Sequence, residues 1–369
     1  MAKQILVIIR RSNGDVLLSS ALLQQLQDYY AGAGIDLLIN DDTLGIAKAL
    51  PAVRRIYCYS YVWKTLPWWA RMRQQVGLIR QLWRRYDLAI SLTTTDSSVL
   101  YARLAGRQAI SLIETDTRKS WWKQRLLDGY YYLDPTQHVI LNHLKALNVL
   151  QIPQGKVITH IQHSAEALQR VQAKLHAQGI RTFLIFHPSA QYAYKIYPDT
   201  LRQQLLHRLN ALGIAIVVTG ANTPLDLHIK VTLPDLDNLY DFIGETSLDE
   251  YIALSHLASA YVGGDTLNMH IAAAQDKPIF AIFGPTLLPI WSPWNNALQT
   301  AATHNQPQQT YSNITIFQAD MACVPCGKAG CDDQHGRSEC LYKINPALIS
   351  TAVSNWMKNI PKENIHDQH

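Results

Sequence analysis

The chain has 369 residues, a length typical of two domains of ordinary size. Apolar residues make up 48% of it and charged residues 17%, a composition that excludes wholesale disorder. The 33 Lys and Arg outnumber the 28 Asp and Glu by only five, so net charge alone does not indicate a nucleic-acid-binding protein.

Short apolar runs alternate with longer segments of helical periodicity along the chain, a pattern typical of βαβ units and parallel sheets. In the first half, the pattern predicts strands at residues 4–9, 35–40, 87–92 and 108–113, and helical spacing over 16–31. In the second half, it predicts strands at 182–187, 214–219, 260–263 and 278–283, and helices at 164–178, 199–211, 247–259 and 267–275. The expected fold is α/β, with two doubly wound domains and ligands bound in the cleft between them.

The turn-rich segment 151–155 is the expected boundary between a domain at 1–155 and a domain at 156–369. No apolar run approaches the ~18 residues that a transmembrane helix needs. The first apolar run, residues 5–9, is too short for the core of a signal peptide and suits a buried strand. Five cysteines do not form a disulfide framework in a chain of this length, so we expect a reducing cytoplasm.

The basic residues are concentrated in the first half. Residues 1–160 hold 20 Lys and Arg against 11 Asp and Glu, whereas residues 161–369 hold 13 against 17. Residues 44–86 contain no acidic side chain, but nine Lys and Arg interleaved with four tryptophans, and 118–125 repeat this chemistry. Basic groups bind phosphates and carboxylates, and tryptophan favours the membrane interface, so an anionic lipid-linked ligand or an anionic leaflet fits. Single-stranded nucleic acid and a plain solvated face are the alternatives.

Two acidic residues lie where a predicted strand passes into a helix. Asp15, in Asn13-Gly14-Asp15, is a candidate general base or, alternatively, an N-cap. Asp265 and Thr266 follow Gly263-Gly264 and open an Ala-rich helix. Such a helix start suits a diphosphate, although a merely capped helix has the same pattern.

A polar loop follows the predicted strand 182–187. It contains His187, Ser189 and Lys195. A lysine in such a loop is able to neutralise a leaving diphosphate, although most surface lysines have no such task.

Four of the five cysteines lie within 18 residues, in the segment 323–340. They are Cys323, Cys326, Cys331 and Cys340. Their number and compactness match a closed tetrahedral site for structural zinc or iron. Reduced free thiols and disulfides are the alternatives.

Several of these motifs together resemble glycosyltransferase family 9, the ADP-heptose:lipopolysaccharide heptosyltransferases. Arg10-x3-Gly14-Asp15 is similar to the opening loop of that family, and His187-Pro188-Ser189 with Lys195-x-Tyr197-Pro198 is similar to its central donor loop. The most specific part is the block at 244–294, which includes Gly264-Asp265-Thr266, Met269-His270 and Phe283-Gly284-Pro285-Thr286.

The resemblance implies a GT-B fold, with two Rossmann-like domains facing a central cleft, and an inverting, metal-independent transfer that needs no cofactor. It implies that Asp15 is the general base and that Lys195 offsets charge on the leaving diphosphate. Asp265 would hold sugar hydroxyls, Thr266 would bind the diphosphate, and Asp226 would contact the ribose. His187, Ser189 and His270 complete the implied donor site, and Arg55, Lys64, Arg71 and Arg73 are the candidate acceptor-binding residues.

The implied function is heptose transfer from ADP-heptose to the inner core of lipopolysaccharide, with a Kdo or heptose acceptor on a lipid A precursor. The implied place is the cytoplasmic face of the inner membrane, with peripheral membrane association and no nucleic acid. One departure motivates an alternative. The family has glycine after the Asp-Thr pair, where this chain has Leu267. A catalytically impaired scaffold subunit and a GT-B transferase for another nucleotide sugar are therefore the competing hypotheses.

Overall fold

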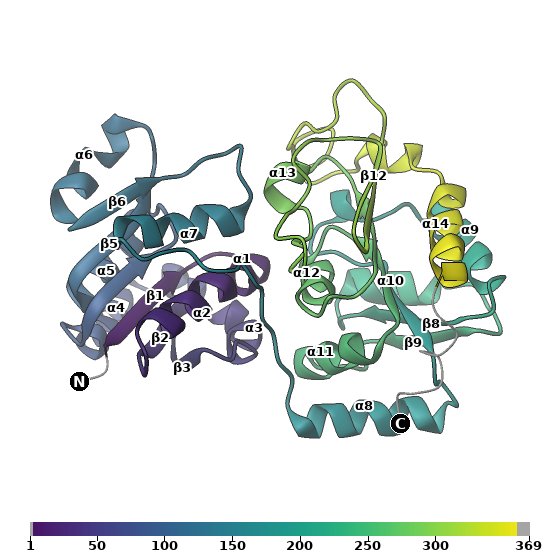
Figure 1. Cartoon of the computed structure of the whole chain (residues 1–369), viewed down its shortest axis with the longest axis horizontal. Helices are drawn as coiled ribbons and strands as arrows, with labels where there is room; N and C mark the ends of the chain where they lie inside the picture. The colour runs from purple at the N-terminus through teal and green to yellow at the C-terminus, as the bar shows by residue number, and fades with distance from the viewer. Residues whose placement is uncertain (1–2, 360–369) are drawn as a thin grey trace. The chain divides into compact units, whose positions relative to one another are not determined.

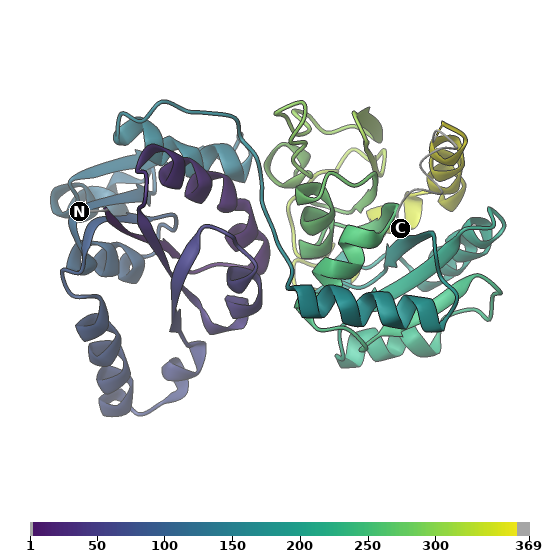
Figure 2. The same ribbon diagram turned by 60° about the horizontal axis from the view of Figure 1, so that its bottom comes forward.

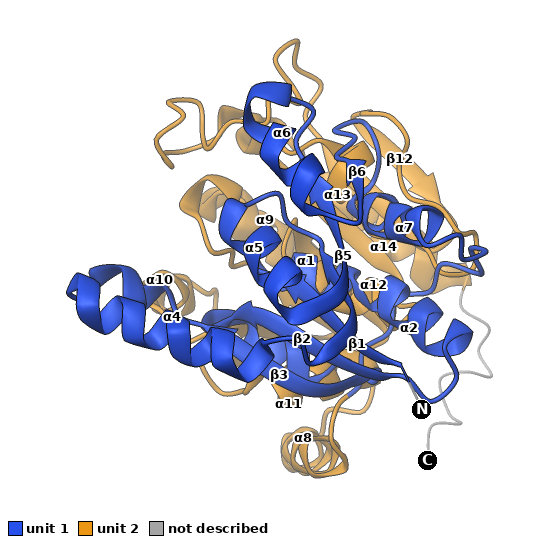
Figure 3. Ribbon diagram, turned by 90° about the vertical axis from the view of Figure 1, so that its left-hand side faces the viewer, with its two compact units in different colours: residues 1–162 blue, residues 163–369 orange. Residues whose placement is uncertain are grey.

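The structure is a computed structural model that describes residues 3–359, and the chain divides into two compact units, residues 1–162 (unit 1) and 163–369 (unit 2) (Figure 3). The division falls after Gln162 because the segment 155–162 is hydrogen-bonded to unit 1. The amide of Gly155 donates to Gln25 Oε1 (2.9 Å), and that of His160 donates to Ser20 Oγ (3.0 Å). The amide of Gln162 donates to the carbonyl of Ala49 (2.9 Å).

Unit 1 is built on a six-stranded, fully parallel sheet in the order β3-β2-β1-β4-β5-β6. Its strands are β1 (Gln4–Ile9), β2 (Gly34–Asn40), β3 (Val53–Tyr59), β4 (Tyr86–Ser91), β5 (Gly106–Ile113) and β6 (Gly129–Tyr132). The central strands are buried nearly throughout, as the apolar runs predict for strands covered on both faces.

The helices of unit 1 connect these parallel strands (Figure 1). They are α1 (Asn13–Leu18), α2 (Ser20–Tyr29), α3 (Leu44–Lys48), α4 (Trp68–Leu82), α5 (Asp96–Ala105), α6 (Thr117–Leu126) and α7 (Val139–Val149), with short 3₁₀ helices η1 (Asp41–Thr43) and η2 (Tyr61–Thr65). The predicted helix over 16–31 is divided at Ser19, whose hydroxyl donates to the carbonyl of Val16 (2.7 Å) and competes with the regular helical bonds.

Unit 2 is built on a seven-stranded sheet in the order β12-β13-β11-β10-β7-β8-β9, parallel except for the β12–β13 hairpin. Its strands are β7 (Phe183–His187), β8 (Ala215–Gly220), β9 (Leu239–Ile243), β10 (Ala260–Gly264), β11 (Ile279–Phe283), β12 (Gln308–Tyr311) and β13 (Ile314–Gln318).

The helices of unit 2 follow the same scheme. They are α8 (Ala165–Ala177), α9 (Asp199–Asn210), α10 (Pro224–Val231), α11 (Leu248–Leu257), α12 (Leu267–Ala274), α13 (Leu288–Trp291) and α14 (Pro346–Asn359), with 3₁₀ helices η3 (Ala193–Lys195) and η4 (Glu339–Lys343). Within residues 3–359, no helix has the length and apolar character needed to cross a membrane.

All eight predicted strands are present, so the predicted α/β class with two doubly wound domains is confirmed. The pattern missed β3, β6, β9 and β12, which are the four outermost strands of the two sheets, and it also missed β13. Outer strands have one unpaired edge, and β3 and β12 expose part of their side chains, so they lack the continuous apolar run of a central strand.

Candidate functional site

Each sheet has a switch point, which is a pair of neighbouring strands whose following connections lead to opposite sides of the sheet. In unit 1 the chain proceeds from β1 to β2 and β3, and then returns to the other side of β1 with β4. In unit 2 the equivalent pair is β7 and β10, where His187, the last residue of β7, pairs with Gly263 of β10. Ligands of open parallel sheets bind beyond the carboxyl ends of such a strand pair. A ligand site in either unit is therefore expected beyond these strand ends.

Asp15 lies beyond the carboxyl end of β1, at the switch point of unit 1. It is the third residue of α1, and its carboxylate reaches back to Ser12, which precedes the helix. Oδ2 accepts from the hydroxyl (2.6 Å) and the amide (3.3 Å) of Ser12, and Oδ1 lies 3.2 Å from Nε of Arg11. The alternative that Asp15 is itself the N-cap is wrong, because Ser12 occupies that position.

Two further residues lie near Asp15: Arg10, which opens the motif Arg10-x3-Gly14-Asp15, and His143, which no motif singled out. Arg10 stacks its guanidinium on the ring of Tyr59, 3.7 Å from the centroid, and donates from Nη1 to Ser97 Oγ (2.6 Å). Burial lowers the pKa of His143, on α7, to about 4, against the opposing charge of Asp15. His143 is therefore neutral beside the carboxylate, and Arg10 and Arg11 are the cations that follow β1.

Lys195 and Asp265 meet at the switch point of unit 2, although they lie far apart in the sequence. Lys195 Nζ is 2.7 Å from Asp265 Oδ2, and Asp265 is almost wholly buried. Burial alone would lower the pKa of Lys195, but the charge of Asp265 and their hydrogen bond outweigh it and raise that pKa above its usual value. Lys195 is therefore a protonated cation that the ion pair with Asp265 fixes beyond the ends of β7 and β10.

His187, the last residue of β7, is buried in the same region. Its Nδ1 lies 3.0 Å from Thr219 Oγ1, and the side-chain amide of Asn268 lies 2.9 Å from the ring nitrogens. Burial lowers the pKa of His187 to about 4, so the imidazole is neutral at pH 7. Thr219 and Asn268 were not predicted, because neither belongs to a recognisable spacing motif.

The start of α12 borders this site. Thr266 precedes the helix and places its hydroxyl 3.4 Å from the hydroxyl of Tyr261, and Leu267 is the first helical residue. Gly263 is required on packing grounds, because a Cβ there would lie 2.6 Å from the carbonyl oxygen of His187. The unpaired amides and the positive dipole end of α12 come directly after Asp265 and Thr266 in the chain.

The remaining donor-site candidates, Asp226, Ser189 and His270, are more buried than Lys195. Asp226 lies in the first turn of α10, where its carboxylate is hydrogen-bonded to the hydroxyl of Thr223. Its other oxygen faces Gly220 at the end of β8. Ser189 lies in the loop after β7, and His270 is buried within α12. Asp226 therefore has a local structural role at the start of α10, whatever it contacts in a ligand.

The four candidate acceptor residues do not lie together. Lys64 is in η2, directly after the carboxyl end of β3, with its ammonium over the ring of Tyr61 (4.6 Å). Arg55 is near the amino end of β3, whereas Asp15 lies beyond the carboxyl ends of the strands. Arg71 and Arg73 are exposed on α4.

The second basic cluster, 118–125, contains one buried cation. Lys123 is fully buried and lies 2.8 Å from both Glu114 and Asp96, and it donates to the carbonyl of Thr94 (2.5 Å). Its charge is therefore compensated internally, and only its exposed neighbours are available to a ligand.

The predicted zinc or iron centre is not supported. Across residues 3–359, no group of three or more His, Cys, Asp and Glu side chains is arranged to hold a metal ion. All four thiols are free, which also excludes the disulfide alternative in this structure. Cys340 is buried in the core of unit 2, whereas the other three are exposed. Burial, with the neighbouring Cys331 and Cys326, raises the pKa of Cys340 to about 11.

The chain is similar to known proteins over most of its length. The profile described as "Glycosyltransferase family 9 (heptosyltransferase)" matches residues 76–319. Lipopolysaccharide heptosyltransferase 3 of Escherichia coli K12 is 25% identical over 324 residues, covering 85% of this chain and 92% of that protein.

Solved structures show the same fold. The ADP-heptose lps heptosyltransferase II of E. coli superposes with a TM-score of 0.72 at 20% identity, covering 96% of this chain and 99% of that one. The E. coli heptosyltransferase WaaC with ADP gives a TM-score of 0.71 at 16% identity, with the same coverage. The predicted GT-B fold class, with two Rossmann-like domains, is confirmed.

Proposed function

The chain belongs to glycosyltransferase family 9, and from this premise we propose that it transfers heptose from ADP-heptose to the inner core of lipopolysaccharide, at a Kdo or heptose hydroxyl. Its relatives include a lipopolysaccharide heptosyltransferase, and one structure of the same fold is a heptosyltransferase with ADP. The observation that carries the proposal is the Lys195–Asp265 ion pair at the switch point of unit 2. A donor site needs a cation that binds the diphosphate, and it needs a carboxylate that orients the sugar hydroxyls. The pair supplies both groups.

We propose that unit 2 binds the donor. Lys195 and the amides at the start of α12 offset the charge of the diphosphate, with Thr266 beside them. Asp265 accepts hydrogen bonds from the sugar, and Ser189, Asp226 and His270 complete the set. His187 is neutral, so it contributes a hydrogen bond rather than charge to the nucleotide side.

We propose that unit 1 supplies the base. The acceptor hydroxyl oxygen attacks the anomeric carbon of heptose while the bond from that carbon to the diphosphate oxygen breaks. Asp15 takes the hydroxyl proton, ADP leaves with the bonding electron pair, and the anomeric configuration inverts. No metal ion is needed in this scheme, because Lys195 and the helix start supply the positive field.

The surroundings of Asp15 bear on this role. One carboxylate oxygen is held by Ser12, and the other is covered by Arg11, whose side chain is half exposed. We propose that the acceptor hydroxyl displaces Arg11 from Oδ1, and that the freed guanidinium then contacts an anionic group of the acceptor. Arg55, Lys64, Arg71 and Arg73 remain candidates for the same task, and Lys64 is the one that lies after the carboxyl end of its strand.

Because the acceptor is lipid-linked, we place the reaction at the cytoplasmic face of the inner membrane, with peripheral association of the enzyme. A scaffold subunit is the second candidate, favoured by Leu267 at the first position of α12. A leucine at that position would occupy space that a glycine leaves free for the diphosphate.

The donor assignment is tested by thermal unfolding with ADP, UDP, GDP or NAD. A ligand at ~100 times its Kd adds about 2.7 kcal/mol to the free energy of unfolding. We expect ADP alone to raise Tm, and ADP-heptose with a core acceptor to yield the heptosylated product and ADP. A preference for UDP or GDP would replace the donor, and ADP binding without transfer would favour the scaffold.

A further inference from the structure

Helix α4 in unit 1 is held to its sheet at one end only. Of its fifteen residues, only Leu78 and Leu82 are buried, and both lie in its second half, where they join the core beside β4. The first half extends away from the rest of unit 1 (Figures 2 and 3). Packing within unit 1 therefore does not explain which side chains the first half of α4 carries.

Those side chains are nevertheless large and apolar. Trp68, Trp69, Met72 and Val76 are 78%, 60%, 49% and 37% exposed. At spacings of three, four and seven residues they fall on one face of the helix, which we call the α4 ridge.

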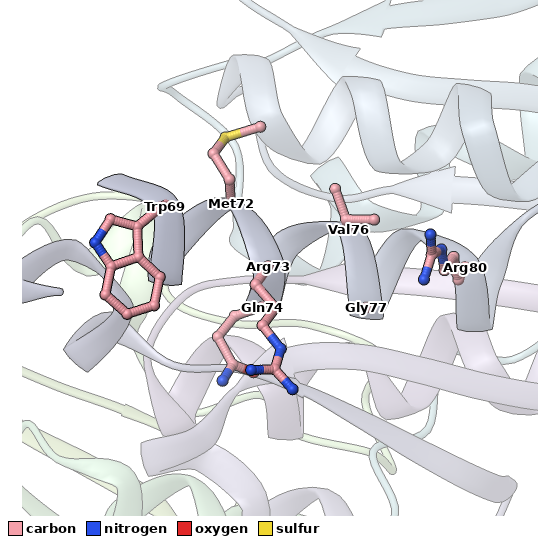
Figure 4. A pocket seen from close by; sticks show the side chains of 7 residues that line it. All are labelled: Trp69, Met72, Arg73, Gln74, Val76, Gly77 and Arg80. Carbon is pink, nitrogen blue, oxygen red and sulfur yellow. The ribbon is translucent and has the colours of Figure 1, made fainter. Parts of the chain in front are cut away.

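A shallow groove runs beside the α4 ridge and is lined by residues of α4 alone (Figure 4). Arg73 and Arg80 border it, and Gly77 leaves it open, since a Cβ at Gly77 would meet nothing within 4 Å. The ridge and the two guanidinium groups thus form one exposed amphipathic surface.

A surface helix of unit 2 shows that this is not a general property of the protein. Helix α8 has thirteen residues and buries Ala167, Val171 and Leu175, spaced along most of its length. None of its exposed residues is a large hydrophobic. Helix α8 thus buries its apolar stripe, whereas α4 exposes one.

We propose that the α4 ridge docks onto a bilayer containing anionic phospholipid. Tryptophan favours the boundary between headgroups and acyl chains, and an amphipathic helix with flanking arginines lies in that plane. Residues 43–86 contain nine Lys and Arg and no acidic side chain, which complements the negative charge of such a leaflet. The inference rests on the proposed function only in that the acceptor is lipid-linked.

The same features disfavour the other occupants. A second copy docked through this ridge would bring Arg73 and Arg80 against their own counterparts, with no nearby acid in 43–86 to pair with them. Single-stranded nucleic acid would use the tryptophans for stacking, but it gains nothing from Met72 and Val76.

The test uses the full chain and sedimentation with vesicles that contain no acceptor. One set contains phosphatidylglycerol and phosphatidylethanolamine, and the other contains phosphatidylcholine alone. We expect binding to the first set, weakened by salt, and a blue shift of tryptophan fluorescence. The triple variant W68A/W69A/M72A should lower the partition coefficient about tenfold or more, and Arg80→Ala should lower it about fivefold on the anionic vesicles.

The matched control is L227A/V231A on α10, which removes two exposed apolar side chains from unit 2 and should leave the partition coefficient unchanged. Circular dichroism and Tm verify that each variant is folded. With a delipidated, water-soluble acceptor, the triple variant should keep wild-type turnover, and it should lose turnover only when the acceptor is embedded in vesicles.

Three results would overturn the proposal. Equal vesicle binding by the triple variant and the wild type would remove the ridge from the interaction. Binding only when acceptor glycolipid is added would make the surface an acceptor site. Loss of a dimer or of oligonucleotide binding in the triple variant, without vesicle binding by the wild type, would identify another partner. Failure of heptose transfer with vesicle binding intact would overturn the proposed function alone.

Discussion

Each unit places a carboxylate beyond one of the two strands at its switch point, but the two carboxylates are held differently. In unit 1, Asp15 follows β1 and pairs with Arg11, whose side chain is 52% exposed. In unit 2, Asp265 follows β10 and pairs with Lys195, which is 27% exposed and has a shorter contact, 2.7 Å against 3.2 Å. The cation of unit 2 is therefore the more enclosed of the two, whereas both carboxylates are buried.

This difference suits two different tasks. A base must be uncovered when its substrate arrives, and an exposed arginine is displaced at little cost because surface ion pairs contribute little. A cation that stabilises a leaving group is most effective when it is already in place, because no reorganisation is then needed during the reaction. The comparison therefore predicts that the two sites respond unequally to equivalent mutations.

The largest effect is expected for Asp15→Asn. Loss of a general base lowers turnover by about a hundredfold to ten-thousandfold, while donor binding in unit 2 should not change. Turnover is measured by ADP release and donor binding by the ADP-induced rise in Tm. The matched control is Asp36→Asn, a buried carboxylate on β2 that pairs with Arg54 (2.9 Å) and Tyr86 (2.8 Å). It should lower stability but leave turnover of the folded enzyme intact. A D15N enzyme that keeps more than about a tenth of its turnover would contradict the role of Asp15.

The next prediction compares the loss of the two cations, Lys195 in unit 2 and Arg11 in unit 1. Lys195→Ala should reduce turnover by about a hundredfold to a thousandfold. It should also lower the free energy of unfolding by about 1–3 kcal/mol, because Asp265 is left buried without its partner. Arg11→Ala should change stability by no more than about 1 kcal/mol and turnover by less than about tenfold, because the buried Asp15 keeps its two hydrogen bonds from Ser12. Steady-state kinetics and urea unfolding measure both, with Lys195→Arg as the charge-conserving control. Equal losses in the two alanine variants would show that the pairs are equivalent.

The third effect leaves turnover aside and concerns stability alone: each unit should show a dependence of its stability on pH through one histidine. Burial lowers the pKa of His143 and of His187 to about 4, below the ~6.5 of an unfolded chain. Between these values the unfolded state binds protons that the folded state does not. Stability should therefore be greatest above pH 6.5 and fall as the pH drops towards 4, by about 3 kcal/mol for each histidine.

Hydrogen exchange assigns this loss to each unit. In His143→Gln the acid-induced loss of protection should shrink in β1 and β4, and in His187→Gln it should shrink in β7 and β10. A variant that flattens the pH dependence in both units, or in neither, would show that the histidine is not the titrating group.

The sequence alone was sufficient for the central strands, for the α/β class and for the family resemblance. Central parallel strands are buried on both faces and must be apolar throughout, so β1, β4, β7 and β10 are visible as runs. The residues that follow them, Asp15 and Asp265 among them, were identifiable because ligand-binding loops occupy a fixed position after such strands.

Contacts between distant segments were decided only by the tertiary structure. Periodicity indicates only the surroundings of one element, so it did not reveal that Lys195 pairs with Asp265 or that Asn268 contacts His187. It also did not separate the acceptor candidates: Arg55 and Lys64 belong to one basic stretch, yet Arg55 lies within β3 near its amino end and Lys64 follows its carboxyl end. Four cysteines close in sequence predicted a metal site, yet packing buried Cys340 and left the others exposed. Sequence spacing constrains how far apart side chains can lie, whereas packing decides which way each one faces.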